Sequence, residues 1–371
     1  MKSICWITAD YFADCDFVPI GEVSKQYRVK WIVLMPKTKS RYKESDFIEY
    51  INEHKNVEIF FYHSRYRWFD PREITDNINI LKLAKSMKCD YFYVNMVASS
   101  PSCAILWNGL PKQHSIITAH HGYVHEGFKR KWIHRLSRKL VYSFAPHVNM
   151  FSESQSLYFV KDYPKSKITI IPLSIKDYGD PSIDNVTGKT HPVVFLSFGQ
   201  IFPSKNIDLL IKAGCRLYED GVRDFKIKIW GYCKEWNCYQ KLIKYPDMFD
   251  TDIRVIPNEE IPNLFASSHY FMQPYKAASQ SGSIKVAYRY NLPVIASDIP
   301  GLIDDMKDGE SGFIFKNNDI DDLVEKMKYV IENHEHLYDD IKEKNIRYVQ
   351  DTYSNDSIGR KYIEMFDKLQ L

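Results

Sequence analysis

The chain of 371 residues has little cysteine and no long hydrophobic run. Its seven cysteines are an odd number without a C-x-x-C pair, which disfavours a disulfide framework or a zinc site and favours reduced thiols. The strongest apolar run, residues 31–36, has the length of a strand, whereas a membrane helix needs about 20 apolar residues. The first residues lead directly to Asp10 and do not resemble a signal peptide. We therefore expect a cytoplasmic protein.

Two glycine-rich nucleotide motifs are also missing. The segment from the first expected strand (residues 4–8) to Asp16 contains no glycine, whereas a dinucleotide-binding motif has G-x-G-x-x-G after this strand. A nicotinamide or flavin enzyme is therefore disfavoured. Residues 199–206 approach a P-loop, but Ser204 and Asn206 stand where that motif has glycine and a hydroxyl residue. Without this hydroxyl a magnesium ligand is lost, so a kinase or an ATPase is disfavoured.

The formal net charge is only +3, but it is unevenly distributed. Residues 1–175 carry 25 Lys and Arg against 16 Asp and Glu, and the remaining residues are net acidic. A cleft between the two halves would have one electropositive wall. Ordinary surface variation is the alternative explanation.

Short β-branched or aromatic runs alternate with amphipathic stretches, a pattern typical of βαβ units and parallel sheets. In the first half this pattern predicts strands at 4–8, 29–35, 58–61, 90–95, 115–119, 147–151 and 168–171, and helices at 75–88 and 129–143. In the second half it predicts strands at 193–198, 226–230, 252–255, 269–272 and 293–296, helices at 205–219, 259–266 and 283–290, and a helical tail at 319–371.

The polar segment 176–192 lacks apolar periodicity and is predicted as a linker. The sequence therefore predicts two doubly wound, Rossmann-like α/β domains, an N-terminal one over 1–175 and a C-terminal one over 193–352. Ligands of such sheets bind beyond the carboxyl ends of the strands, so we expect the active site in a cleft between the domains.

One candidate anion-binding loop follows the strand at 193–198. Gly199 ends the strand, and Lys205 stands at the start of the next helix, where its charge adds to the partial positive charge of the helix N-terminus. This combination suits a pyrophosphate. A solvated lysine at a helix start is the alternative.

A second candidate loop follows the strand at 269–272. Small and hydroxyl residues precede a helix that begins near Ser283, so backbone N–H groups can approach an anion closely. Ser281 and Ser283 can add hydroxyl donors to such a site. Capping of the helix by these serines is the alternative.

With these two loops in place, the sequence resembles the nucleotide-sugar-dependent glycosyltransferases of family 4, which have the GT-B fold. Residues 198–210 are similar to the family's GR-x-x-x-x-KG phosphate motif. The other similar segments are 229–231, 256–266, 292–301 and 309–313, followed by a C-terminal stretch (353–371) similar to the family's crossover helix, which packs back onto the first domain.

The resemblance implies a site and a reaction. The donor, most simply a UDP-sugar, is expected to be held by Gly199, Gln200, Lys205, Ser279, Gln280, Ser281, Gly282 and Ser283. The family implies transfer with retention of configuration, no obligatory metal or cofactor, and a saccharide or glycolipid acceptor. It also suggests bacterial cell-surface polysaccharide or glycolipid synthesis.

The sequence departs from the family in three places. Ala278 and Val286 stand where the family's Glu-x7-Glu motif has its glutamates, and Gln280-Ser281-Gly282 resembles a subgroup with a QSG loop. Gln200 replaces the family arginine and cannot supply charge. Lys205 is therefore expected to be the main protein cation on the leaving diphosphate.

The first half resembles the family more weakly. Thr118-Ala119-His120-His121-Gly122 is similar to the loop whose histidine reaches the donor sugar; either histidine fits, and we favour His121 as the catalytic one because it adjoins the glycine. A zinc site built on His121 and His125 is a poor alternative, because no third ligand is evident. Ser152 is similar to the family's strand-end serine before a helix.

Three aspartates follow the first strand and are expected to face the same cleft. The carboxylates of Asp10, Asp14 and Asp16 could bind acceptor hydroxyls, and solvated loop aspartates are the alternative.

Residues 128–140 are basic and amphipathic: the segment contains six Lys and Arg residues together with the aromatic Phe128 and Trp132. This segment could rest on an anionic membrane at the inner face of the plasma membrane, or be an ordinary helix with a solvated face. Without a recognised nucleic-acid motif, nucleic acid is not expected as a partner.

The sequence thus predicts a glycosyltransferase that moves a hexosyl-type sugar from a nucleotide diphosphate donor to a hydroxyl acceptor. Two alternatives stay open: a nucleotide-sugar epimerase on the same fold, and a catalytically silent GT-B protein that only binds.

Overall fold

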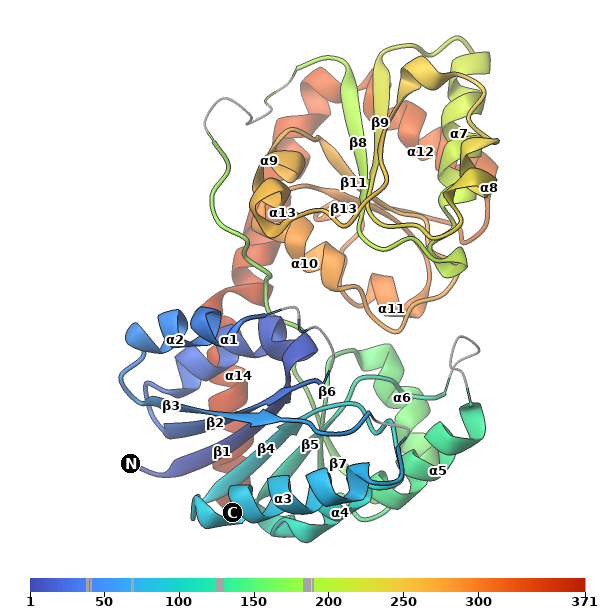
Figure 1. Ribbon diagram of the computed structural model, residues 1–371. Coiled ribbons are helices and arrows are strands. Elements are labelled where there is room, and N and C mark those ends of the chain that lie inside the picture. Colours follow the sequence, from blue (N-terminus) through green and yellow to red (C-terminus); the bar gives the residue numbers. More distant parts are fainter. Residues whose placement is uncertain are drawn as a thin grey trace. The chain divides into compact units, whose positions relative to one another are not determined.

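The computed structural model describes residues 1–37, 40, 42–67, 70–124, 130–182, 188 and 190–370. The chain divides into two compact units (Figure 1): unit 1 contains Met1–Ser174 and Tyr353–Leu371, and unit 2 contains Ile175–Thr352. In the predicted linker 176–192, residues 183–187 and 189 lie outside the described residues.

Unit 1 is built on a seven-stranded sheet with the order β3-β2-β1-β4-β5-β6-β7, in which all paired strands are parallel. The strands are β1 (Ser3–Ala9), β2 (Arg28–Met35), β3 (Val57–His63), β4 (Tyr91–Asn95), β5 (Ser115–Ala119), β6 (His147–Met150) and β7 (Lys167–Ile170). The seven strands predicted for this half are all present, because each is a short apolar run with a local signal.

Helices cover both faces of this sheet. One face packs on α3 (Glu73–Ser86), α4 (Cys103–Gly109), α5 (Lys131–Tyr142) and α6 (Glu153–Asp162), and the other on α1 (Ala13–Val23), α2 (Glu44–Asn52) and α14 (Asn355–Asp367). The sequence pattern did not predict α1, α2 or α4. Helix α1 contains Pro19 and Gly21, which weaken a helical pattern, and α4 has only seven residues.

The C-terminal helix α14 belongs to unit 1, as the sequence predicted. Its Tyr362 ring lies 5.6 Å from the ring of Trp6, and the hydroxyls of Tyr362 and Tyr93 are 3.3 Å apart. Tyr27 donates a hydrogen bond to Asp367 at 2.6 Å. The end of the chain therefore completes the core of a unit that begins at residue 1.

Unit 2 contains a six-stranded parallel sheet with the order β10-β9-β8-β11-β12-β13. Its strands are β8 (Val193–Phe198), β9 (Phe225–Trp230), β10 (Phe249–Asp252), β11 (Tyr270–Gln273), β12 (Val294–Ser297) and β13 (Gly312–Phe315). Its longer helices are α7 (Ile207–Glu219), α9 (Ile261–Ala266), α10 (Gly282–Arg289), α12 (Ile320–Glu332) and α13 (His334–Tyr353), with shorter ones at α8 (Trp236–Gln240) and α11 (Pro300–Ile303).

Three sequence predictions for unit 2 need correction. Strand β13 was not predicted, and β10 lies three residues before the predicted strand at 252–255. The tail 319–371 is not one helical stretch: it breaks at Asn333 and at Ser354, whose hydroxyl caps α14 by accepting from the N–H of Ser357. A capping side chain satisfies a helix terminus locally, so it starts a new helix inside a periodic pattern.

The order of the strands places the two candidate anion loops side by side. Strands β8 and β11 are hydrogen-bonded neighbours, and parallel neighbours end at the same edge of the sheet. The loop from β8 to α7 and the loop from β11 to α10 therefore leave the sheet next to each other.

Candidate functional site

The chain after β8 lies so close to the chain after β9 that glycine is needed on both sides of the contact. Gly199 has φ of +101°, and its N–H donates to the carbonyl of Trp230 at 3.0 Å. A Cβ on Gly231 would lie 2.0 Å from the carbonyl oxygen of Gly199. These two glycines therefore let two strand ends meet backbone to backbone.

Lys205 ends the short 3₁₀ turn η4 (Pro203–Lys205), directly before α7. Its side chain is half-buried and its Nζ lies 3.4 Å from the carbonyl oxygen of Phe198, at the end of β8. Asn206 is in the left-handed conformation and donates a side-chain hydrogen bond to Asn318. The turn thus folds the lysine back over the strand end, whereas Gln200 is exposed.

The serines of the second loop bind one another and Gln273. Ser281 is the N-cap residue of α10, but its hydroxyl donates to Gln273 Oε1 at 2.9 Å instead of accepting a helix N–H. The Nε2 of Gln273 donates to Ser283 Oγ at 3.1 Å, and the two serine hydroxyls are 3.0 Å apart. The capping alternative is therefore wrong for the Ser281 hydroxyl. Ser279 and Gln280 are half-buried beside it.

Tyr275 connects the two loops. The Nζ of Lys205 lies 5.3 Å from the centre of the Tyr275 ring, and the tyrosine hydroxyl is 3.4 Å from Ser283 Oγ. Burial raises the pKa of Tyr275, but the Lys205 ammonium and the Ser283 hydrogen bond outweigh it, so that the pKa lies below its ordinary value. Between the same loops, the N–H of Lys276 donates to the Ser204 carbonyl at 2.8 Å. The structure therefore brings Lys205 and the serine-glycine turn together.

Two residues at this site could not be predicted from the sequence. Tyr275 is not one of the polar residue types that suggested an anion site, and Lys176 lies in the predicted linker, 106 positions before Gly282, the first residue of α10. A Cβ on Gly282 would lie 3.1 Å from the Nζ of Lys176, so this lysine lies against the first residue of α10. A cation at this place adds to the positive end of the helix dipole.

The two residues that stand in place of the family's glutamates, Ala278 and Val286, take part in the packing of unit 2. Val286 is 2% exposed and lies in the core, and the carbonyl oxygen of Ala278 would be 2.1 Å from a Cβ on Gly301. Glycine at 301 thus allows α11 to pack against the second loop. Among the described residues, no group of three His, Cys, Asp or Glu side chains is placed to hold a metal ion.

In unit 1, the two candidate histidines directly follow β5 and differ in their surroundings. His120 is 5% exposed, and its Nε2 is 2.6 Å from Asn95 Oδ1. The ring of Phe12 stacks on it at 3.8 Å, with an angle of 5° between the rings. His121 is half-buried, and its carbonyl oxygen accepts from Arg138 at 2.8 Å.

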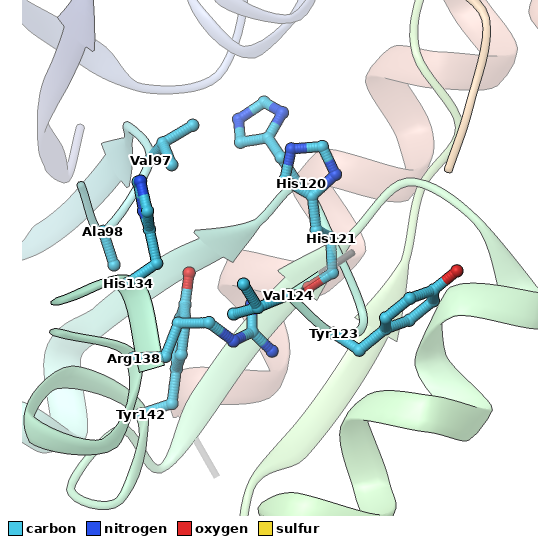
Figure 2. A pocket seen from close by; sticks show the side chains of 9 residues that line it. All are labelled: Val97, Ala98, His120, His121, Tyr123, Val124, His134, Arg138 and Tyr142. Carbon is cyan, nitrogen blue, oxygen red and sulfur yellow. Dashed lines mark hydrogen bonds between the residues drawn. The ribbon is translucent and has the colours of Figure 1, made fainter. Parts of the chain in front are cut away.

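Both histidines line a small cavity of about 20 Å³ (Figure 2). Its other lining residues come from the segment after β4, from the loop after β5 and from α5: Val97, Ala98, Tyr123, Val124, His134, Arg138 and Tyr142. His125, the second residue of the zinc alternative, lies outside the described residues.

The three candidate aspartates differ in burial. Asp10 is 4% exposed and accepts from the Ser40 hydroxyl at 2.6 Å, whereas Asp14 is half-buried and its Oδ1 lies 3.4 Å from Cys15 Sγ. Asp16 is fully buried, and its oxygens accept from the Thr8 hydroxyl and the Asn95 amide. Burial raises the pKa of Asp16 to about 7, although both hydrogen bonds lower it. The expectation for Asp16 is therefore corrected: its carboxylate faces the core.

The basic segment 128–140 also needs a correction. Residues 128 and 129 lie outside the described residues, and α5 begins at Lys131. Arg138 is 8% exposed and donates to the carbonyls of His121 and Gly122, so it is not a surface cation. Among the described helices, none is long and apolar enough to cross a membrane.

Comparison with known proteins shows which proteins this chain resembles. Residues 180–348, nearly all of unit 2, match the family model of glycosyl transferases group 1. The two parallel-sheet α/β units match GT-B glycosyltransferase structures over the whole chain, so the protein has the GT-B fold.

Three individual proteins illustrate the similarity. An uncharacterized glycosyltransferase of Haemophilus influenzae is 26% identical over 176 residues; these are 47% of this chain and 49% of the relative, so the chain matches about half of that protein's length. A glycosyltransferase structure from Rickettsia africae has a TM-score of 0.74 at 16% identity, covering 100% of this chain and 98% of its own. Anabaena Alr3699/HepE in complex with UDP-glucose has a TM-score of 0.73 at 14% identity, covering 99% and 100%.

Proposed function

We propose that the protein is a family 4 glycosyltransferase with a QSG loop, which transfers a sugar from a nucleotide diphosphate-sugar to a hydroxyl acceptor. The observation that carries this proposal is the convergence of Lys205 and the Ser281–Ser283 turn through Tyr275. It is supported by the glycosyl transferases group 1 match, which covers both loops.

In this proposal unit 2 holds the donor by its diphosphate. The Lys205 ammonium neutralises the charge that develops on the departing phosphate, and the first N–H groups of α10 donate to the same group. Gly199, Gly282 and the serine hydroxyls allow close approach, and Gln200, Ser279 and Gln280 border the site. A cation and preorganised donors stabilise the leaving group without proton transfer, so the protein needs no metal or cofactor for this step.

We propose a UDP-sugar as the donor and retention of its configuration. The similar Anabaena protein binds UDP-glucose, which supports the choice of base and of a hexosyl donor. The acceptor is proposed to be a saccharide or glycolipid hydroxyl bound by unit 1, with Asp10 and Asp14 as hydrogen-bond acceptors for its hydroxyls.

Of the two histidines, we propose His120 in place of His121 as the one that meets the donor sugar. Its ring lies at the carboxyl end of β5 and is held by Asn95 and Phe12. His121 instead contributes its backbone carbonyl to Arg138. The substitutions His120→Ala and His121→Ala, compared for turnover, distinguish the two assignments.

The reaction class is tested by incubating the protein with UDP-, GDP- and ADP-sugars, with and without saccharide acceptors. Acceptor-dependent release of the nucleotide is the expected result. A donor converted to another sugar would identify an epimerase, and binding without release or conversion would identify a silent binding protein. Either of these two results would refute the proposed transfer.

A surface on unit 1 supports a location at a membrane. The exposed side of α5 and the residues after it form a basic–apolar face, made of Trp132, Arg135, Leu136, Lys139, Leu140 and Phe144. Its four apolar side chains are 68%, 41%, 36% and 55% exposed, although they repeat every four residues as a buried helix face would. Helix α5 contains no acidic residue.

We therefore propose that this face rests on anionic lipid at the cytoplasmic side of a bacterial membrane. There it would meet a growing cell-surface polysaccharide or a glycolipid. A cation near an anionic surface contributes about 1 kcal/mol, so removing the two cations of this face, Arg135 and Lys139, should weaken vesicle binding about 30-fold. Sedimentation with vesicles of phosphatidylglycerol measures this, with the exposed Lys307 and Lys328 of unit 2 as a matched control. Equal binding by both variants would refute the membrane contact.

A further inference from the structure

A chain of buried polar side chains leads from the core of unit 1 to His120. Asp16 and Asn95 are fully buried, and His120 is 5% exposed. The Nδ2 of Asn95 donates to Asp16 Oδ1 at 2.8 Å, and Asn95 Oδ1 lies 2.6 Å from His120 Nε2. The proposed transfer assigns no role to Asp16 and names Asn95 only as a contact of the His120 ring.

The direction of each hydrogen bond in this chain follows from its first member. An indole N–H can only donate, so Trp31 Nε1 donates a hydrogen bond to Thr8 Oγ1 at 3.0 Å. The Thr8 proton then points to Asp16, which accepts at 2.5 Å. Asp16 therefore accepts one hydrogen bond from Thr8 and a second one from Asn95.

The carboxylate of Asp16 fixes the orientation of the Asn95 amide. With Asp16 ionised, turning the amide over would bring its oxygen against a carboxylate oxygen at 2.8 Å, so that two acceptors would be in contact in a buried place. In the observed orientation the amide oxygen points to Thr118, which donates at 3.2 Å, and to His120. A carbonyl oxygen can only accept, so His120 Nε2 must carry the proton.

We infer that Asn95, oriented by Asp16, is a positioning residue that holds His120 in the tautomer with its proton on Nε2. The neutral ring then presents Nδ1 as an acceptor, and the stacked Phe12 ring sets the plane in which that acceptor lies. The chemical class of group that it recognises is a hydroxyl. That this hydroxyl belongs to the donor sugar or acceptor rests on the proposed function, whereas the tautomer does not.

The tautomer is measured on the full chain labelled with ¹⁵N-histidine, from the long-range couplings of the ring nitrogens, without any substrate. His120→Gln identifies the signals. The expected result is a protonated Nε2 in the wild type and a loss of this preference in Asn95→Ala. Asn149→Ala is the matched control, because Asn149 is equally buried in β6 of the same sheet but donates to Tyr93 at 2.8 Å.

A wild-type His120 with its proton on Nδ1, or an unchanged preference in Asn95→Ala, would overturn the inference. The wild-type spectrum decides the tautomer even where Asn95→Ala does not fold. If the protein transfers no sugar, the spectrum is unaffected, so failure of the proposed function is distinguished from failure of this inference. Where transfer occurs, Asn95→Ala should lower kcat at least tenfold and leave the affinity for free UDP unchanged, whereas Asn149→Ala should lower neither.

Discussion

Replacing Lys205 by alanine tests the proposed donor site most directly. The substitution removes the ammonium beside the Tyr275 ring and at the end of β8, where its contact with the Phe198 carbonyl is long at 3.4 Å. The stability of unit 2 should therefore change little. A hydrogen bond to a charged group contributes roughly 1.5–3 kcal/mol, which corresponds to a 10- to 150-fold decrease in turnover.

The assay follows release of the nucleotide from the donor at saturating acceptor. Because charge on the diphosphate grows as the sugar departs, the loss should appear mainly in kcat and less in KM. Lys212→Ala is the matched control: this lysine lies on the next turn of α7, is exposed and pairs with Asp208 at 3.3 Å. Turnover of Lys205→Ala within threefold of Lys212→Ala, with equal thermal stability, would show that Lys205 does not contact the leaving group.

Three further predictions concern unit 2. Burial, and secondly the neighbouring His334, lowers the pKa of His269 from 6.5 to about 4. On acidification the unfolded chain therefore binds this proton before the folded protein does. The free energy of unfolding should be constant above pH 6.5 and fall by about 3 kcal/mol towards pH 4, which urea unfolding measures. A pH-independent unfolding free energy over this range would contradict the assignment. Lys285→Met removes the ammonium that lies 2.6 Å from the buried Asp305 carboxylate and should lower the free energy of unfolding by about 3–5 kcal/mol. The double variant Lys285→Met/Asp305→Leu should recover most of this loss in the same measurement. Gly231→Ala places a Cβ 2.0 Å from the Gly199 carbonyl, so calorimetry should detect weaker UDP binding; unchanged affinity would exclude this loop from the site.

Much of the fold could be predicted from the sequence because its signals are local. A buried parallel strand is a short apolar run, and the runs at β1 to β9 stand between polar segments. Strand β13 was missed because its four residues begin with glycine, and α1 because Pro19 and Gly21 interrupt its pattern. The two candidate anion loops could be predicted because a glycine, a lysine and clustered serines follow strand ends, where ligands bind in such sheets.

The amino-acid order alone indicated the class of fold and singled out the two loops and Lys205 as candidates. Only the tertiary structure decided that Tyr275 joins the loops, that Lys176 lies against α10, that Asp16 faces the core and that Asn95 meets His120. Asp16 and Asn95 are 79 positions apart in the sequence. Their contact arises because β1 pairs with β4, which sets Asn95 beside Thr8 and close to α1, the helix after β1 that carries Asp16. Neither strand's own residues specify which partner it will have.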